Sequence, residues 1–132
     1  MPGKKYVLCI DDDQDDCSLL AESLRKANSI LVQHFENSAE SALQFLKDAV
    51  ANDHLPEIIV LDINLPGMDG LHLLSEIKKI LPRYVPVVFF STNFDDDTVL
   101  FAESNGASII KKPTSIKGYD EIAHTILSSM LS

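Results

Sequence analysis

The sequence predicts an α/β fold, with one five-stranded, parallel, doubly wound sheet and five helices. Two observations lead to this prediction. Short apolar runs alternate five times with longer segments of helical periodicity. The third and fourth runs are nearly all apolar, which is typical of parallel strands covered on both faces. Five such strand-helix units with right-handed crossovers form a doubly wound sheet.

The expected elements follow in order along the chain. The strands are short and rich in Val, Ile and Phe, and span residues 5–10, 30–35, 57–61, 85–90 and 107–111. Four helices show apolar stripes, formed by Leu20, Leu24 and Ala27; Ala42, Leu46 and Val50; Leu71, Leu74, Ile77 and Leu81; and Tyr119, Ile122, Ile126 and Met130. The fourth helix in chain order, around residues 99–102, is short and has no clear stripe.

Capping residues agree with these boundaries. Ser38 is placed to cap the second helix, and one of residues 95–97 the fourth. Gly106 stands where a helix ends in a left-handed residue. There is no repeat, linker or low-complexity tract, and the length suits one domain. We therefore expect a single domain over residues 1–132, with no output domain.

Composition narrows the class of protein. The net charge of −9 disfavours direct nucleic-acid binding and suits a cation or a basic partner surface. No apolar run approaches the roughly 20 residues of a membrane span. The first apolar run stops at Asp11, so it is no signal peptide, and we expect a cytoplasmic protein without membrane contact. Cys9 and Cys17 have no metal-ligand spacing and are interpreted as small buried hydrophobes.

Polar side chains gather at the predicted carboxyl ends of the strands, where doubly wound sheets bind ligands. The first strand is followed by Asp11 and Asp12, and the third by Asp62 and Asn64. The fourth and fifth strands are followed by a hydroxyl, from Ser91 and Thr92, and by the ammonium of Lys112.

These groups suit phosphoryl transfer. Crowded carboxylates raise one another's pKa unless a positive charge intervenes, and Mg²⁺ is a hard cation that prefers oxygen ligands. Positioning and charge neutralisation account for most of the catalysis of phosphoryl transfer. An aspartate can itself accept the phosphoryl group.

The sequence resembles the receiver domain of two-component response regulators over nearly its full length. Four matching segments occur in the expected order: residues 7–13 (VLCIDDD), 59–70 (IVLDINLPGMDG), 86–91 (PVVFFS) and 106–113, which ends in Lys112-Pro113. The resemblance implies that Asp62 is the phosphoacceptor and that a sensor histidine kinase or a histidine phosphotransfer protein is the donor. It thus implies a phosphorylated signalling protein and not a dedicated enzyme.

The resemblance also assigns roles to the other site residues. Asp11, Asp12, Asp62 and the backbone carbonyl of Asn64 are implied to hold Mg²⁺ or another divalent cation such as Mn²⁺. Ser91 and Lys112 are implied to contact the phosphoryl group. The Lys112–Pro113 peptide bond is implied to be cis. The output surface corresponds to residues 95–104, 107–111 and 119–130, through which a downstream effector protein would bind.

Two positions depart from the family pattern. Ile109 stands where family members usually carry an aromatic residue that follows the phosphate-bound hydroxyl. Thr92 stands where the family commonly has a small residue, and its branched side chain is expected to narrow access to the phosphoryl site.

Other interpretations remain beside this one. A haloacid-dehalogenase-like phosphatase needs a second aspartate where this chain has Asn64, and neither a flavin phosphate loop nor a P-loop is present. The main alternative is a receiver-fold binding module that signals without phosphorylation. Among single residues, Asp13, Asp15 and Asp16 are interpreted as solvated charges at a helix start. Lys111 is interpreted as a surface charge, and the four histidines as structural or exposed.

Overall fold

The computed structural model describes residues 5–28 and 31–131 and contains the predicted alternation of strands and helices. The strands are β1 (Tyr6–Ile10), β2 (Val32–Glu36), β3 (Ile58–Leu61), β4 (Val87–Ser91) and β5 (Ala107–Lys111). The helices are α1 (Gln14–Ala27), α2 (Ala39–Ala51), α3 (Gly70–Ile80), α4 (Asp96–Ser104) and α5 (Ile116–Leu131). Residue 30, where the second strand was expected to begin, lies outside the described residues.

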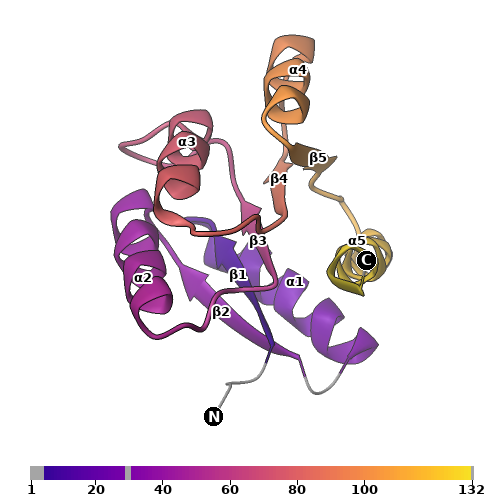
Figure 1. Ribbon diagram of the computed structural model, residues 1–132. Coiled ribbons are helices and arrows are strands. Elements are labelled where there is room, and N and C mark those ends of the chain that lie inside the picture. The colour runs from indigo at the N-terminus through magenta and orange to yellow at the C-terminus, as the bar shows by residue number, and fades with distance from the viewer. Residues whose placement is uncertain (1–4, 29–30, 132) are drawn as a thin grey trace.

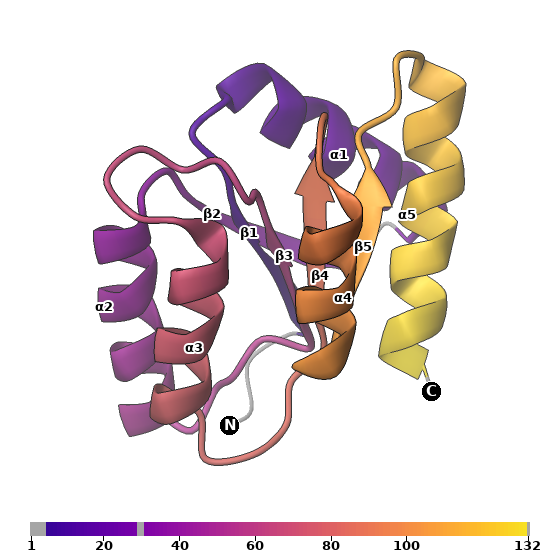
Figure 2. The same cartoon turned by 90° about the horizontal axis from the view of Figure 1, so that it is seen from above.

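The strands form one parallel sheet in the order β2-β1-β3-β4-β5. This order confirms the doubly wound fold and makes β1, β3, β4 and β5 neighbours. All residues of β1, β3 and β4 are buried, because helices cover both faces of these central strands. Figure 2 shows the arrowheads of β4 and β5 pointing to the end of the sheet where α1 begins and the chain turns into α5.

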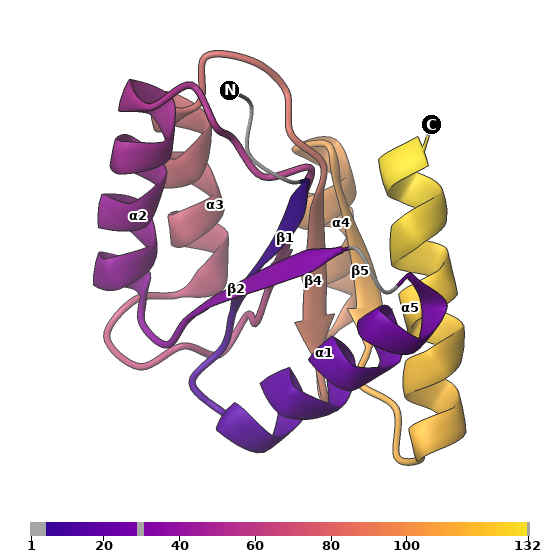
Figure 3. The same cartoon turned by 90° about the horizontal axis from the view of Figure 1, so that it is seen from below.

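Two hydrophobic layers hold the helices on the sheet. Figure 1 shows α2 and α3 on one side of the sheet and α1 and α5 on the other. Side chains of α2, α3 and α4 pack on one face, around Leu46, Leu74 and Ala102. Side chains of α1 and α5 pack on the other face, around Leu24 and Ile126. Seen from below, α1 lies beside α5 (Figure 3). The strand residues alternate between the two layers, as the pleat of a strand requires.

The predicted caps are present. Ser38 caps α2 by accepting from the backbone N–H of Ser41, and Asp95 caps α4 by accepting from that of Thr98. Gly106 follows α4 with φ +76°, in the left-handed region that glycine adopts without steric cost. These three helix-boundary predictions are confirmed.

The predicted stripes need two changes. Ala27 is exposed at the last position of α1, so the buried stripe of this helix consists of Cys17, Leu20, Ala21 and Leu24. Leu81 lies one residue past the end of α3, as its C-cap. The side chain of Met130 lies outside the described part of the chain. No described helix is long and apolar enough to cross a membrane.

Candidate functional site

Two residues of the predicted site are held by the hydrogen-bond ladder of the sheet. The backbone N–H of Asp62, one residue past β3, donates to the carbonyl of Ile10 in β1 at 2.9 Å. The backbone N–H of Lys112, one residue past β5, donates to the carbonyl of Ser91 in β4 at 2.8 Å. The ladder therefore places these side chains at one edge of the sheet through backbone hydrogen bonds alone.

Close packing of α3 against β3 shapes the same edge. A Cβ atom added at Gly70, the first residue of α3, would lie 2.6 Å from the Cα of Ile63 and 2.9 Å from the carbonyl oxygen of Asp62. Side chains do not tolerate such distances to backbone atoms. Glycine at this position lets the helix begin directly against the segment that carries Asp62.

Three carboxylates converge at this edge. One oxygen from each of Asp11, Asp12 and Asp62 lies within 4.8 Å of the others. Asp11 and Asp62 are buried, whereas Asp12 is exposed. A hard divalent cation prefers carboxylate oxygens and keeps several waters, so a cluster with two buried members and one exposed member fits such an ion.

Lys112 compensates the negative charge of the cluster from within. Its buried Nζ lies 2.8 Å from Oδ2 of Asp11, 2.9 Å from Oδ2 of Asp16 and 3.2 Å from Oδ2 of Asp62. The interpretation of Asp16 as a solvated charge was therefore wrong. Asp16 lies on the first turn of α1, 96 residues before Lys112, so no local pattern indicated this contact.

Burial and neighbouring charges shift the pKa values of Asp11 and Lys112 in opposite directions. Burial raises the pKa of Asp11 to about 6, against the lowering effect of Lys112. Burial also lowers the pKa of Lys112, but its bonds to Asp11 and Asp16 outweigh this effect and raise the pKa above its ordinary value. Lys112 is therefore a permanent cation at neutral pH.

Ser91 joins the site through Asn64. The hydroxyl of Ser91 is fully buried at the last position of β4 and donates to the carbonyl of Asn93 at 3.2 Å. It also accepts from the side-chain amide of Asn64 at 3.2 Å. The backbone N–H of Asn64 donates in turn to Oδ1 of Asp62 at 3.0 Å. Sequence reasoning assigned only the carbonyl of Asn64, so this side-chain contact was missed.

The remaining residues singled out by the sequence lie as follows. Asp13 caps α1, accepting from the N–H groups of Asp15 and Asp16, which confirms a helix-start role. Thr92 and Lys111 are exposed. Every peptide bond of the described residues is trans, so the expectation of a cis Lys112–Pro113 bond was wrong; in this structure the chain turns from β5 toward α5 without it.

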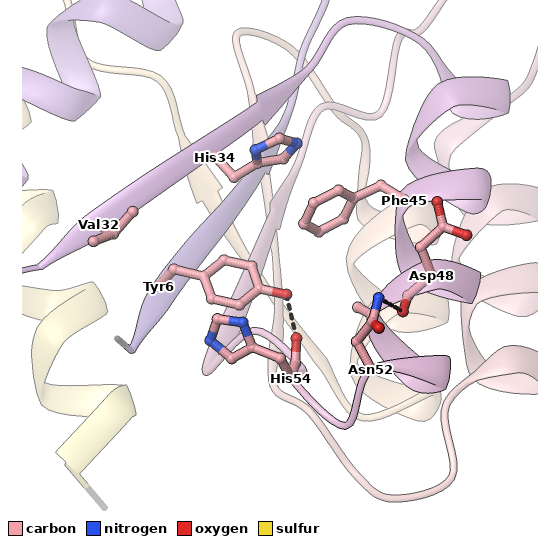
Figure 4. Close-up of a pocket in the computed structure, with 8 residues that line it drawn as sticks. Tyr6, Val32, His34, Phe45, Asp48, Asn52 and His54 are labelled. Atoms are coloured by element: carbon pink, nitrogen blue, oxygen red, sulfur yellow. Dashed lines mark hydrogen bonds between the residues drawn. The ribbon is translucent and has the colours of Figure 1, made fainter. Parts of the chain in front are cut away.

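A separate hollow of about 450 Å³ lies beside β2 and α2 (Figure 4). Rings fill much of its wall: His34 stacks on Phe45 with centroids 4.0 Å apart, and Tyr6 meets His54 edge to face. Tyr6 begins β1, whereas Asp11 directly follows the last residue of that strand. The hollow is therefore at the opposite end of β1 from the carboxylates.

Comparisons with known proteins agree with this geometry. The family model described as the response regulator receiver domain matches residues 7–123. The response regulator Rcp1 of Synechocystis is 30% identical over 99 residues, which cover 73% of this chain and 67% of Rcp1. A protein-glutamate methylesterase of Dechloromonas aromatica is 34% identical over 119 residues, or 89% of this chain. The chain spans only 33% of that relative, and 22% of the transcriptional regulator NtrC of Escherichia coli.

Solved structures show the same fold. The phosphorylated cyanobacterial phytochrome response regulator RcpA superposes with a TM-score of 0.84 at 27% identity, covering 98% of this chain and 96% of RcpA. The Mn²⁺-bound form of Rcp1 superposes with a TM-score of 0.78 at 26% identity, covering 94% of this chain and 92% of Rcp1. The first of these neighbours is a phosphorylated protein, and the second contains a divalent metal ion.

Proposed function

Because this chain belongs to the response regulator receiver domain family, we propose that it accepts a phosphoryl group on Asp62 from a phosphohistidine donor. The observation that supports this most strongly is the position of Asp62, buried at the end of β3 between an acidic pair and the ammonium of Lys112. The donor would be a sensor histidine kinase or a histidine phosphotransfer protein, as receiver domains generally use.

In the proposed reaction, a carboxylate oxygen of Asp62 attacks the phosphorus atom. The new P–O bond forms while the bond from phosphorus to the donor's imidazole nitrogen breaks, and that nitrogen keeps the electron pair. A divalent cation held by Asp11, Asp12, Asp62 and the carbonyl of Asn64 would neutralise charge on the transferred group. Lys112 supplies a second, permanent positive charge, and the hydroxyl of Ser91 becomes a donor to a phosphoryl oxygen once it turns from Asn93.

Phosphorylation would then alter the surface that partners bind. It adds roughly −1.5 to −2 charges at one point. Ser91 and Lys112 would contact the new phosphoryl oxygens. If these contacts are stronger in one conformation of the domain than in another, phosphorylation shifts the population toward the first, which is how a switch works. We place the effector-binding surface on α4, β5 and α5. Exposed Leu100 and Phe101 on α4 support a protein partner there.

Intact mass spectrometry tests the proposal. The protein is incubated with Mg²⁺ and acetyl phosphate, and we expect a base-labile gain of one phosphoryl group that Asp62→Ala abolishes. Asp97→Ala is the matched control, because Asp97 is an exposed aspartate on α4 and should leave the gain unchanged. If the folded parent protein gains no phosphoryl group, the proposal is wrong. The protein would then be a receiver-fold binding module that works without phosphorylation.

A further inference from the structure

Lys112 has one carboxylate partner that lies outside the metal-binding cluster. Asp11 and Asp62 belong to the cluster, whereas Asp16 lies outside it, in the first turn of α1. Asp16 nevertheless approaches the ammonium as closely as Asp11 does, at 2.9 Å compared with 2.8 Å. A cation bound to the cluster would compete with Lys112 for two of its three partners and would leave its contact with Asp16 in place.

The second oxygen of Asp16 reaches α5. The hydroxyl of Tyr119, in the first turn of α5, donates to Oδ1 of Asp16 at 3.2 Å, while Oδ2 of the same carboxylate contacts Lys112. Tyr119 is buried, and its ring meets Phe90 edge to face with centroids 5.9 Å apart. The ammonium of Lys112 lies 5.7 Å from the centroid of the same Phe90 ring. These four side chains therefore form a closed set of contacts that joins β4, β5, α1 and α5.

The position of the ammonium must change when a phosphoryl group arrives. An ammonium has three N–H donors, and the three carboxylates occupy all of them. Any donor given to a phosphoryl oxygen must leave a carboxylate. Charge-assisted hydrogen bonds in a buried site are strong and directional. A shift of Lys112 therefore alters its bond to Asp16, and with it the hydrogen bond that Tyr119 donates to Asp16.

β5 lacks the aromatic residue that, in the family pattern, follows the phosphate-bound hydroxyl. Ile109 packs against the hydrophobic layer of α2, α3 and α4, on the face opposite Tyr119. It has neither a ring nor a hydroxyl with which to follow Ser91. Tyr119 offers both groups, from α5.

We propose that Asp16 is a positioning residue for Lys112 and that, through the hydroxyl of Tyr119, it couples the phosphoryl site to α5. This inference rests on the proposed function, because it concerns how the state of Asp62 is transmitted. Asp16 acts through Lys112 and does not touch the reacting atoms. When Lys112 moves, the Asp16 carboxylate moves with it, and the hydrogen bond from the Tyr119 hydroxyl to Asp16 changes direction.

The experiment compares two variants with two matched controls. Tyr119→Phe removes only the hydroxyl and keeps the ring on Phe90. Its control is Tyr84→Phe, which removes a hydroxyl that donates at the same 3.2 Å to the carbonyl of Gly106. Asp16→Asn removes one charge but keeps an acceptor for Tyr119. Its control is Asp15→Asn, which removes the same charge from an exposed neighbour.

The readout is the set of backbone amide signals in ¹⁵N–¹H NMR spectra, before and after addition of Mg²⁺ and beryllofluoride. We expect the wild type and both controls to respond near Asp62 and along α5. Tyr119→Phe should respond near Asp62 but lose the response along α5. Asp16→Asn should lose it too, and its phosphorylation by acetyl phosphate should slow roughly tenfold, as expected for the loss of one charge-assisted hydrogen bond.

The outcomes separate this inference from the proposed function. A wild type that responds at both places, with a Tyr119→Phe variant that still responds along α5, overturns the coupling and leaves the function standing. A folded wild type with no response near Asp62 overturns the proposed function and the coupling with it. The spectrum itself shows whether each variant is folded. If Asp16→Asn does not fold, the response of Tyr119→Phe along α5 alone tests the coupling.

Discussion

The Nζ atom of Lys112 lies 2.8 Å from Oδ2 of Asp11, and both side chains are buried. Each charge therefore depends on the other for compensation in a region with little water. Asp62 and Asp16 share the same ammonium, so one cation balances three carboxylates. The stability of the protein without metal should depend strongly on this single side chain.

Lys112→Ala should lower the free energy of unfolding by about 3 kcal/mol or more in EDTA, because it leaves buried carboxylates without a counter-charge. Mg²⁺ should restore part of the loss, since the ion compensates the same carboxylates. Urea unfolding measures both effects. Lys111→Ala is the control: this neighbour is exposed, and we expect a change within about 0.5 kcal/mol. Equal effects of the two substitutions would contradict the prediction.

The raised pKa of Asp11 predicts a pH dependence of unfolding without metal. Its ordinary value is 3.8, and burial raises the pKa to about 6 in the folded protein. The folded state therefore binds this proton more tightly than the unfolded state. The stabilisation is complete below pH 3.8 and is lost as pH rises through about 6. In urea unfolding across this range, Asp11→Asn should lack that component; a wild type and variant with parallel pH profiles would be evidence against it.

Metal binding should show the opposite pH dependence, because Mg²⁺ requires an ionised Asp11. The rise in melting temperature caused by a fixed Mg²⁺ concentration should be larger at about pH 8 than at about pH 5. Thermal unfolding with and without Mg²⁺ measures this difference. Mg²⁺ that stabilises the protein equally at both pH values would rule out Asp11 as the titrating ligand.

Thr92→Ala should speed phosphorylation by small phosphodonors. Thr92 is exposed and directly follows Ser91, and we expect its branched side chain to narrow access to the phosphoryl site. We expect an increase of about threefold with acetyl phosphate, equal to about 0.6 kcal/mol in barrier height. The rate of mass gain measures this increase. Thr92→Ser removes only the methyl group, so its rate should lie between those of the wild type and Thr92→Ala. An unchanged rate in Thr92→Ala would exclude a steric role.

Gly70→Ala should destabilise the protein by about 1–3 kcal/mol, because the new Cβ would meet backbone atoms of Ile63 and Asp62 that have no room to move. The shift of Asp62 should also weaken Mg²⁺ binding. Thermal unfolding with and without Mg²⁺ tests both effects. His72→Ala, at an exposed position of the same helix, is the control and should change neither quantity appreciably.

The order of elements could be predicted from the sequence because its signals are local. A short run that is apolar throughout, such as Ile58–Leu61, is typical of a parallel strand covered on both faces, and a cap such as Ser38 acts within four residues. The carboxylates could be placed for the same reason. Asp11 and Asp62 directly follow such runs, and the ends of parallel strands meet at one edge.

The tertiary structure alone decided which of these side chains touch. The contact of Asp16 with Lys112 depends on where α1 lies against β5 and α5, and the contact of Asn64 with Ser91 depends on how the loop after β3 folds toward β4. Ala27 continues the spacing of Leu24 but is exposed at the last position of α1. The sequence by itself therefore determined the alternation of strands and helices, the doubly wound fold class and the acidic edge, whereas the order of the strands was seen only in the structure. Long-range packing determined how one ammonium is shared among three carboxylates, because residues that are far apart in the chain meet only after the helices have docked.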